Sequence, residues 1–424
     1  MPRNAAAEAD DFISARPSHT LYNLCRHVLP LVLPALGIVD VDYRPEDLQR
    51  LRDLGHRRVL LTPNHPTNLE PALLFHLSAA VRTPFHFLAC RESFAQAGGL
   101  WGEFIRRIGA YSVVRGTVDR SSFRATRDLL AQPGAKLVVF PEGEVYSQND
   151  SLLPFHSGVF QIVFWALEDI RKQAEEGADG IPADADVSLF ILPVAIKYRF
   201  TADMSEAIAA SLHRLEQFTG LPPAPSDPPY DRLRRIGEAM LRSLESEYRL
   251  PVPKDADPLD LTPRLDAVKE AILHRVAAAA GVGLPKGDTL PERMRALMHV
   301  IETVTREEPR EPTPYETELR RHQRERARPL LHDLQRLANW IAVYDGYVRA
   351  EPTPERMADT LTRLERECFG DAKIGGPRRC IVRLGDPIDV AEHWEAYTQK
   401  RRAEVAALTR ETERRVAALL HAAV

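Results

Sequence analysis

Two patterns of apolar positions occur along the chain, one typical of strands and one typical of helices. Up to about residue 200, short apolar runs of strand length alternate with longer segments whose apolar positions recur every three or four residues. The runs predict strands at 58–62, 85–89, 110–114, 136–140 and 187–196. The segments between them predict helices at 69–81, 97–108, 121–130 and 155–172. Alternating strands and helices predict an α/β fold with a largely parallel central sheet, flanked by helices on both faces.

The strand pattern stops near residue 201 and returns only near residue 379. Between these points helical periodicity predicts helices at 203–219, 229–248, 263–280, 290–306, 314–349 and 354–368. A last strand is expected at 379–384, in the same sheet as 187–196, and a last helix at about 400–420. We therefore predict four parts: an N-terminal segment at 1–44, an α/β core at 45–200, a mostly α-helical insertion at 201–375, and the return of the α/β domain at 376–424.

Charge and cysteine content exclude some classes of function. The chain has 424 residues, with 56 Lys and Arg against 60 Asp and Glu, for a net charge of −4. This balance argues against a nucleic-acid partner. The four cysteines form no CxxC pair, so zinc-ribbon and thioredoxin motifs are absent, and their scarcity fits the reducing cytoplasm. They are Cys25, Cys90, Cys368 and Cys380.

No apolar run reaches the length of about eighteen residues that a membrane span needs, and the acidic start predicts no secretory signal. The segment 21–39 is mostly apolar and contains Arg26 and His27. It is either an interfacial helix at a membrane surface or a helix packed on the sheet. The basic run 320–328 offers a second, weaker candidate for lipid headgroups, or a solvated helix face.

A histidine and a glutamate follow the first predicted strand of the core, in the segment Asn64-His65-Pro66-Thr67-Asn68-Leu69-Glu70. A histidine of near-neutral pKa can take a proton from a hydroxyl, and a carboxylate can orient its ring. The other interpretation is a capping box of Thr67 and Glu70, in which Glu70 serves only the start of a helix.

Three more segments lie at predicted strands. The first, Gly109-Ala-Tyr-Ser-Val-Val-Arg115, places an arginine that suits a phosphate, or a surface ion pair, after a strand. The second, 136–144, runs a strand into a Pro-Glu-Gly turn, where glycine permits close approach to a ligand or simply a loop. In the third, Ile191-Leu-Pro-Val194, the proline suggests an edge strand or a bulge in an otherwise structural strand.

These segments, in this order, resemble the four blocks of the glycerolipid acyltransferase family, which includes lysophosphatidic acid acyltransferases. The family reads roughly NHxxxxD, GxxFxxR, FPEGTR and V/I-P-V, and this chain has NHPTNLE, GAYSVVR, FPEGEVY and ILPV. The strand and turn RLGDPIDV with its following helix also resemble the end of that domain. The resemblance covers about 45–200 and 378–424, and 201–375 has no assigned counterpart.

The resemblance implies a role for each matched residue. His65 is the general base, and Glu70 stands where the family usually has aspartate and orients His65. Arg115 binds an acceptor phosphate. Asn64, Phe140, Pro141, Glu142 and Gly143 complete the substrate-binding set. The family chemistry implies no metal and no cofactor, with acyl-CoA or acyl-carrier protein as co-substrate.

The implied function is transfer of a fatty acyl group from an acyl thioester to a hydroxyl of a glycerolipid or lysophospholipid. The expected location is the cytoplasm, peripheral at the inner face of a membrane. One position departs from the family, because Glu144 and Val145 follow Gly143 where an arginine is usual. This departure argues against a preference for lysophosphatidic acid, unless Lys197 or Arg199 supplies the missing cation. The alternative function is a catalytically silent lipid-binding or scaffold protein that uses the helical insertion for partners.

Overall fold

A computed structural model describes residues 12–114, 119–175, 187–251, 260–285, 287, 289–305, 313–344 and 346–423. The chain divides into two compact units. The α/β unit comprises Met1–Val145, Asn149–Thr201 and Pro377–Val424, and the helical unit comprises Tyr146–Gln148 and Ala202–Gly376.

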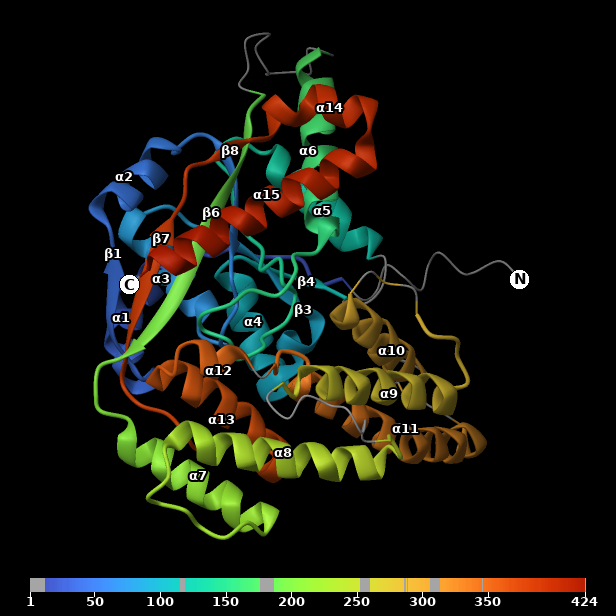
Figure 1. Ribbon diagram of the computed structural model, residues 1–424. Helices are drawn as coiled ribbons and strands as arrows, with labels where there is room; N and C mark the ends of the chain where they lie inside the picture. The colour runs from blue at the N-terminus through green and yellow to red at the C-terminus, as the bar shows by residue number, and fades with distance from the viewer. Residues whose placement is uncertain are drawn as a thin grey trace. The chain divides into compact units, whose positions relative to one another are not determined.

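The strands of the α/β unit form one sheet (Figure 1), with the order β1-β7-β6-β2-β5-β3-β4 and β8 paired with β6. The pairs β1–β7, β2–β5, β2–β6, β3–β4 and β3–β5 are parallel, and β6 is antiparallel to β7 and β8. The predicted fold class is therefore confirmed, as is the return of the chain to the same sheet. The strands are β1 Ile38–Tyr43, β2 Arg58–Pro63, β3 His86–Cys90, β4 Ala110–Val113, β5 Lys136–Val138, β6 Leu189–Phe200, β7 Arg378–Leu384 and β8 Ile388–Asp389.

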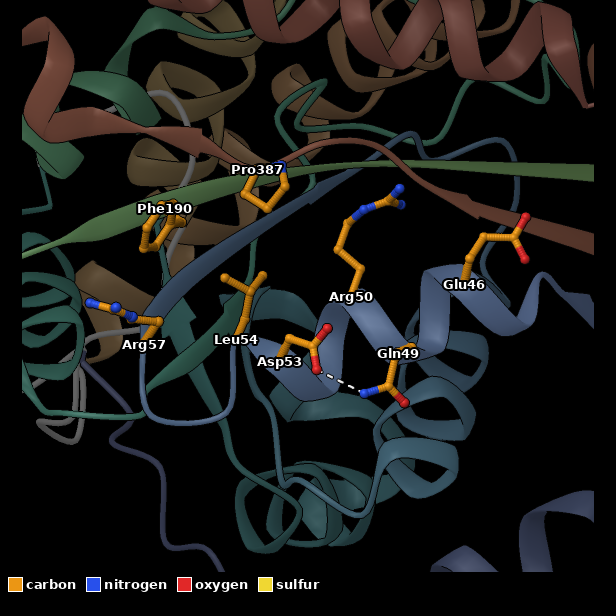
Figure 2. A pocket seen from close by; sticks show the side chains of 8 residues that line it. All are labelled: Glu46, Gln49, Arg50, Asp53, Leu54, Arg57, Phe190 and Pro387. Atoms are coloured by element: carbon orange, nitrogen blue, oxygen red, sulfur yellow. Dashed lines mark hydrogen bonds between the residues drawn. The ribbon is translucent and has the colours of Figure 1, made fainter.

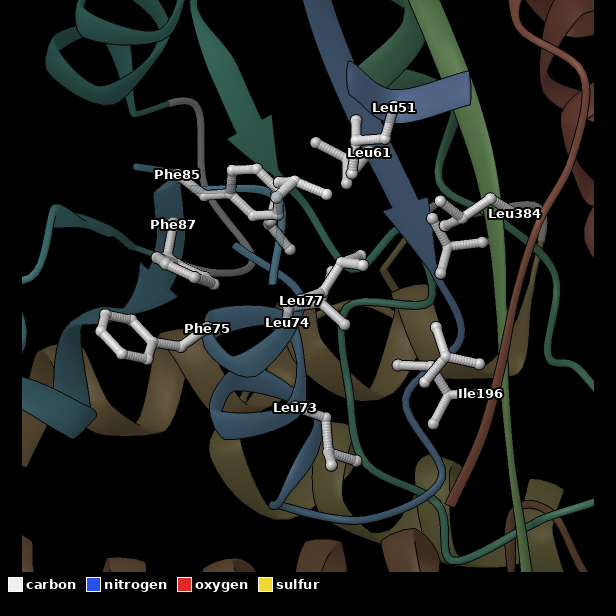
Figure 3. Close-up of a cluster of buried hydrophobic side chains, with 14 of the residues drawn as sticks. Leu51, Leu61, Leu73, Leu74, Phe75, Leu77, Phe85, Phe87, Ile196 and Leu384 are labelled. Carbon is white, nitrogen blue, oxygen red and sulfur yellow. The ribbon is translucent and has the colours of Figure 1, made fainter. Parts of the chain in front are cut away.

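Helices cover both faces of this sheet, and each face has its own apolar core. On one face, α1 His19–Val32, α2 Pro45–Asp53, α3 Glu70–Val81 and α4 Leu100–Arg107 pack on the sheet. Figure 3 shows the leucines and phenylalanines that α3 and β3 contribute to this core, beside Ile196 and Leu384. The other face holds α5 Arg120–Ala131, α6 Ser157–Glu175, α14 Trp394–Gln399 and α15 Arg401–Ala422.

The position of Pro193 corrects the expectation of an edge strand or bulge. Its strand β6 lies inside the sheet, and the alternation of core faces continues through the proline without a bulge. The carbonyl of Pro193 accepts the N–H of Gly385, in the turn between β7 and β8. Because the N and O of one strand residue point to the same side, the missing N–H faces this turn, and no ladder hydrogen bond is lost.

The segment 21–39 is not one helix. The helix α1 is followed by the short 3₁₀ helix η1, Leu33–Leu36, and then by β1, which the sequence pattern did not predict. The predicted helix 97–108 is also divided, between the 3₁₀ segment η2 Arg91–Gly99 and α4. The last 3₁₀ helix of the unit, η3, spans Val390–His393.

The helical unit contains α7 Ser205–Thr219, α8 Pro229–Glu247, α9 Thr262–Ala280, α10 Leu290–Thr305, α11 Pro314–Trp340, α12 Gly346–Ala350 and α13 Pro354–Phe369. The predicted helix 314–349 is therefore interrupted near its end, because α11 stops at Trp340 and the chain is helical again from Gly346. The chain turns at Trp340, whose carbonyl accepts Val343 N–H, and the side chain of Gln148 donates to the Ala342 carbonyl. The hydroxyl of Thr353 caps α13 by accepting Arg356 N–H, as its sequence predicted.

Buried Arg–Glu pairs join successive helices of this unit. Arg232 of α8 pairs with Glu216 of α7, and Arg264 of α9 pairs with Glu245 of α8. In the basic run 320–328, Arg321 pairs with Glu318 and Glu325 on the exposed surface of α11. This arrangement is that of a solvated helix face.

Candidate active site

Two adjacent parallel strands, β2 and β5, bring the first site residues together. β2 ends at Pro63 and β5 ends at Val138, so the loops that follow leave the same edge of the sheet. Open α/β sheets bind ligands at this edge. The backbone N–H of His65, in the loop after β2, donates to Oε1 of Glu142, in the loop after β5, at 2.9 Å. The two motifs therefore meet at one place.

His65 forms a close pair with Glu70. Its Nδ1 lies 2.7 Å from Glu70 Oε2, and its ring stacks on Phe140 with centroids 4.0 Å apart. The carboxylate has no exposed surface, whereas the His65 side chain is 15% exposed. An Nδ1–H that donates to the carboxylate leaves Nε2 as the unprotonated nitrogen of the neutral ring. His65 is thus arranged to accept a proton at Nε2.

Glu70 also serves the start of α3, of which it is the first residue. The backbone N–H of Thr67 lies 3.1 Å from both carboxylate oxygens, and the Thr67 hydroxyl donates to Oε1 at 2.6 Å. The predicted capping box is not formed, because Leu69 and not Thr67 is the N-cap of α3 and no side chain caps this helix. One carboxylate contacts the histidine and the loop before the helix together.

A residue that sequence reasoning missed completes this cluster. The hydroxyl of Tyr198, on β6, donates to Oε1 of Glu70. Burial and the nearby charge of Glu70 raise the pKa of this tyrosine well above its ordinary value, so it is a neutral donor. No sequence motif includes Tyr198. The alternation of side chains along β6 is the one signal that could have predicted its position on the face of the sheet that carries α3.

Glu142 ties two loops together through their backbones. Oε1 accepts His65 N–H and Oε2 accepts Leu153 N–H at 2.8 Å. Burial raises the pKa of Glu142 to about 7, against the opposing effect of these two N–H donors and of the positive charge that His65 can carry.

The other residues of this block shape the turn. Gly143 has a φ of +71°, and its N–H donates to the Phe140 carbonyl at 3.0 Å. The Pro141 carbonyl accepts His156 N–H at 2.9 Å. The glycine therefore permits a left-handed turn that few other residues adopt.

Asn64 contacts the sheet. Its side-chain Nδ2 donates to the Ile196 carbonyl at 2.9 Å, and its Oδ1 accepts Ile196 N–H at 2.7 Å. The amide thus extends the pairing of β2 with β6 by one residue beyond the end of β2. These contacts favour a role in fixing the loop that carries His65.

Arg115, the expected phosphate ligand, lies outside the described residues. Its strand β4 ends at Val113 and lies two places from β5 in the sheet order. Gly109, the glycine of the same block, has a φ of +106°, and a Cβ there would lie 2.8 Å from the Phe85 carbonyl oxygen. This glycine is required by the backbone alone.

The alternative cation Lys197 points to the opposite face of the sheet. Its Nζ lies 3.2 Å from Asp150 Oδ1 and 3.4 Å from the Leu420 carbonyl of α15. Arg199 has the same strand parity as Lys197, and Tyr198 lies between them on the His65 face. Lys197 is therefore already paired, away from His65.

A separate hollow lies at the other end of the strands. A cavity of about 540 Å³ lies here. Figure 2 shows Glu46, Arg50 and Asp53 of α2 along it, with Arg57 and Phe190 at one end. It has no histidine and lies at the amino end of β2, away from His65. Its lining is mixed in charge and contains no residue of the four blocks that resemble the acyltransferase family.

Residues 41–197 match the family model described as Acyltransferase. This segment is an acyltransferase domain. It begins within β1 and ends within β6, so it contains His65, Glu70 and the Phe140–Gly143 turn. No curated protein matches the chain. The match to this domain supports acyl transfer to glycerolipids in general. The residues that follow Lys197 lie beyond the matched segment.

Proposed function

We propose that this acyltransferase moves a fatty acyl group from an acyl thioester, acyl-CoA or acyl-carrier protein, to a hydroxyl of a glycerolipid or lysophospholipid. The observation that carries the proposal is the pairing of His65 Nδ1 with the buried Glu70 carboxylate, which leaves Nε2 as a base. The pair lies at the sheet edge where α/β domains bind ligands.

His65 would act twice in the reaction. Nε2 takes the proton of the acceptor hydroxyl while that oxygen attacks the thioester carbonyl carbon. Glu70 stabilises the imidazolium that forms. When the tetrahedral intermediate collapses, the carbon–sulfur bond breaks and the proton passes from His65 to the leaving thiolate. The products are an ester and a free thiol, and His65 is neutral again.

The acceptor is expected to carry little concentrated negative charge. A phosphomonoester carries close to two negative charges near neutral pH. The FPEG turn of this chain continues with Glu144 and Val145 where the family has an arginine, and Lys197 is paired with Asp150. We therefore propose a lysophospholipid with a phosphodiester, or a neutral acceptor, in preference to lysophosphatidic acid, with Arg115 as the proposed phosphate ligand.

We also propose that α1 lies on a membrane surface. Among the described helices, none is long and apolar enough to cross a bilayer. Two faces of α1 are apolar, however, since Tyr22, Cys25 and Leu29 pack toward the core while another stripe is exposed to solvent. That exposed stripe is Leu24, Val28, Leu31 and Val32. The segment 12–39 contains arginine and histidine but no acidic residue, which suits anionic lipid headgroups.

A matched pair of variants tests the catalytic proposal. His393 and Glu404 of the same unit also pair at 2.7 Å, and the His393 side chain is 20% exposed, similar to His65. With labelled acyl-CoA or acyl-carrier protein and a panel of lysolipids, we expect His65→Ala to lower kcat by about 10²–10⁴-fold. His393→Ala should leave kcat near that of the wild type.

The result would be read by mass spectrometry of the product, with circular dichroism to show that each variant is folded. Normal turnover by folded His65→Ala would contradict the role of the base. If the folded wild type transfers no acyl group from either donor to any acceptor, the catalytically silent lipid-binding protein becomes the better interpretation.

A further inference from the structure

We infer that Tyr198 is a positioning residue of this acyltransferase, which fixes the Glu70 carboxylate and through it the orientation of His65. The inference rests on the proposed function, because it assigns the source of the geometry that His65 needs as a base. Tyr198 lies one residue beyond the segment that matches the family model.

The two oxygens of Glu70 share the backbone N–H of Thr67 but have different side-chain partners. Oε1 accepts the hydroxyls of Tyr198 and Thr67, the second at 2.6 Å, while Oε2 lies 2.7 Å from His65 Nδ1. A carboxylate with no exposed surface needs such donors to keep its charge. The hydroxyl of Tyr198 therefore satisfies one oxygen of Glu70 and leaves the second oxygen turned toward His65.

Tyr198 is itself held by Asn149 and Arg378. Asn149 accepts Tyr198 N–H at 2.7 Å and donates to the Tyr198 carbonyl at 2.8 Å. The guanidinium of Arg378, on β7, lies 4.9 Å from the centre of the tyrosine ring. The side chain is 2% exposed. A donor fixed in this way loses little conformational freedom when it binds the carboxylate.

The arrangement explains why a glutamate can stand where the family has aspartate. Aspartate is shorter by one carbon–carbon bond, about 1.5 Å. An aspartate at position 70, the first residue of α3, could not keep the contacts with Tyr198 and His65 both at their present lengths. Tyr198 and Glu70 thus form a matched pair in this chain.

The charges around this cluster set the expected direction of a pH effect. His65 and the Glu142 loop approach from one side, and Arg378 and Cys380 of β7 lie near Tyr198 and Glu70. Removal of the Tyr198 hydroxyl leaves the Glu70 charge less satisfied, so Glu70 holds a proton on His65 more firmly. Because His65 works as a base only when neutral, the acid limb of kcat/KM should move to higher pH.

The test compares Tyr198→Phe with Tyr111→Phe in the full-length protein. Tyr111 is the matched control, since it is also buried and bonds a hydroxyl, that of Thr126, at 2.7 Å in the same unit. We expect Tyr198→Phe to lower kcat by about tenfold or more, as for loss of a hydrogen bond to a charged group. KM should change little, and the acid limb should move to higher pH. Tyr111→Phe should change neither the limb nor kcat.

A second readout does not depend on turnover. With ¹⁵N-labelled histidine, the His65 resonances report its tautomer and its titration, and we expect Tyr198→Phe to raise the His65 midpoint. Thr67→Val removes the other hydroxyl donor to the same oxygen and should also raise the His65 midpoint. This variant decides the test if Tyr198→Phe does not fold.

The outcomes separate the two proposals. A wild type without acyl transfer would overturn the proposed function, and the His65 titration would still decide the role of Tyr198. An active wild type with inactive His65→Ala, but with unchanged kcat, pH profile and His65 titration in folded Tyr198→Phe, would overturn the positioning role alone. Equal losses in Tyr198→Phe and Tyr111→Phe would also overturn it.

Discussion

At the scale of single residues, a His–Glu contact alone does not identify a site. His65 with Glu70 and His393 with Glu404 have the same separation, and the two histidines are similarly exposed, whereas Glu70 is fully buried and Glu404 is 17% exposed. Only the first pair follows a parallel strand at its carboxyl end and has the further hydroxyl donors. The sequence could predict His65, Glu70 and Glu142 because each lies beside a strand that its apolar pattern reveals. It could not predict Tyr198, whose role depends on the register of β6 against β2.

Glu142 should make the stability of the protein depend on pH. Its folded-state pKa is raised to about 7 from the ordinary 4.5, so the stability linked to its proton is fully present below about 4.5 and is lost as the pH rises through about 7. The amide of Glu142→Gln does not titrate. The free energy of unfolding of the wild type should therefore fall relative to this variant across that window, by about 3 kcal/mol.

Urea unfolding of both proteins below and above this window measures the difference. Glu144→Gln, two residues along the same loop, is the control and should follow the wild type. A constant difference between the wild type and Glu142→Gln at all pH values would show that Glu142 keeps an ordinary pKa.

At the scale of elements, periodicity predicted the strands and helices that are apolar on a buried face. It missed β1 because this strand is at the edge of the sheet and is half polar. Asp40 and Asp42 alternate with apolar residues there and pair with Arg379 and Arg383 of β7. A charged edge strand protects the sheet from pairing with other chains. The apolar segment 21–39 was interpreted as a single helix, so the change from helical to strand periodicity within it was missed.

The exposed stripe of α1 should bind lipid vesicles. Leu31 is 80% exposed on this stripe, and Leu319 of α11 is an exposed leucine in the helical unit. We expect Leu31→Glu to lower binding to vesicles of phosphatidylcholine with anionic phosphatidylglycerol by about tenfold, since one large apolar side chain no longer enters the interface. Leu319→Glu should bind as the wild type does, measured by co-sedimentation. Equal binding by the wild type and both variants would show that the exposed stripe of α1 is not the membrane contact.

At the scale of the whole molecule, the apolar periodicity of the sequence showed that the strand pattern stops near residue 201 and returns near residue 379. The compact units divide between Thr201 and Ala202 and between Gly376 and Pro377. No pattern could show that Tyr146–Gln148, just after the FPEG turn, belongs to the helical unit. Within that unit, Arg363 donates to the Ser147 carbonyl, and Arg366 donates to the Ser147 hydroxyl, both at 2.8 Å. These contacts join residues more than two hundred positions apart in the chain.

The α/β unit should fold after excision of the helical segment 202–376. The two ends that excision leaves already lie together, because the N–H and the hydroxyl of Thr201 both donate to the Pro377 carbonyl, at 2.9 and 3.1 Å. Chain ends so close can be joined by a short Gly/Ser linker with little entropic cost. Each face of the sheet also has its own core within the α/β unit.

We expect the shortened protein to unfold cooperatively in urea and to retain the histidine resonances of the His65–Glu70 pair. Because Ser147 and Gln148 lose their partners in the helical unit, its free energy of unfolding should be lower than that of the full chain. Excision of 213–376, which leaves the first turns of α7 attached without the helices they pack on, is the control and should be less stable than excision at Thr201. A non-cooperative transition or loss of the His65 resonances after excision at Thr201 would mean that the sheet requires the helical unit, and the helices would then be an integral part of the α/β fold.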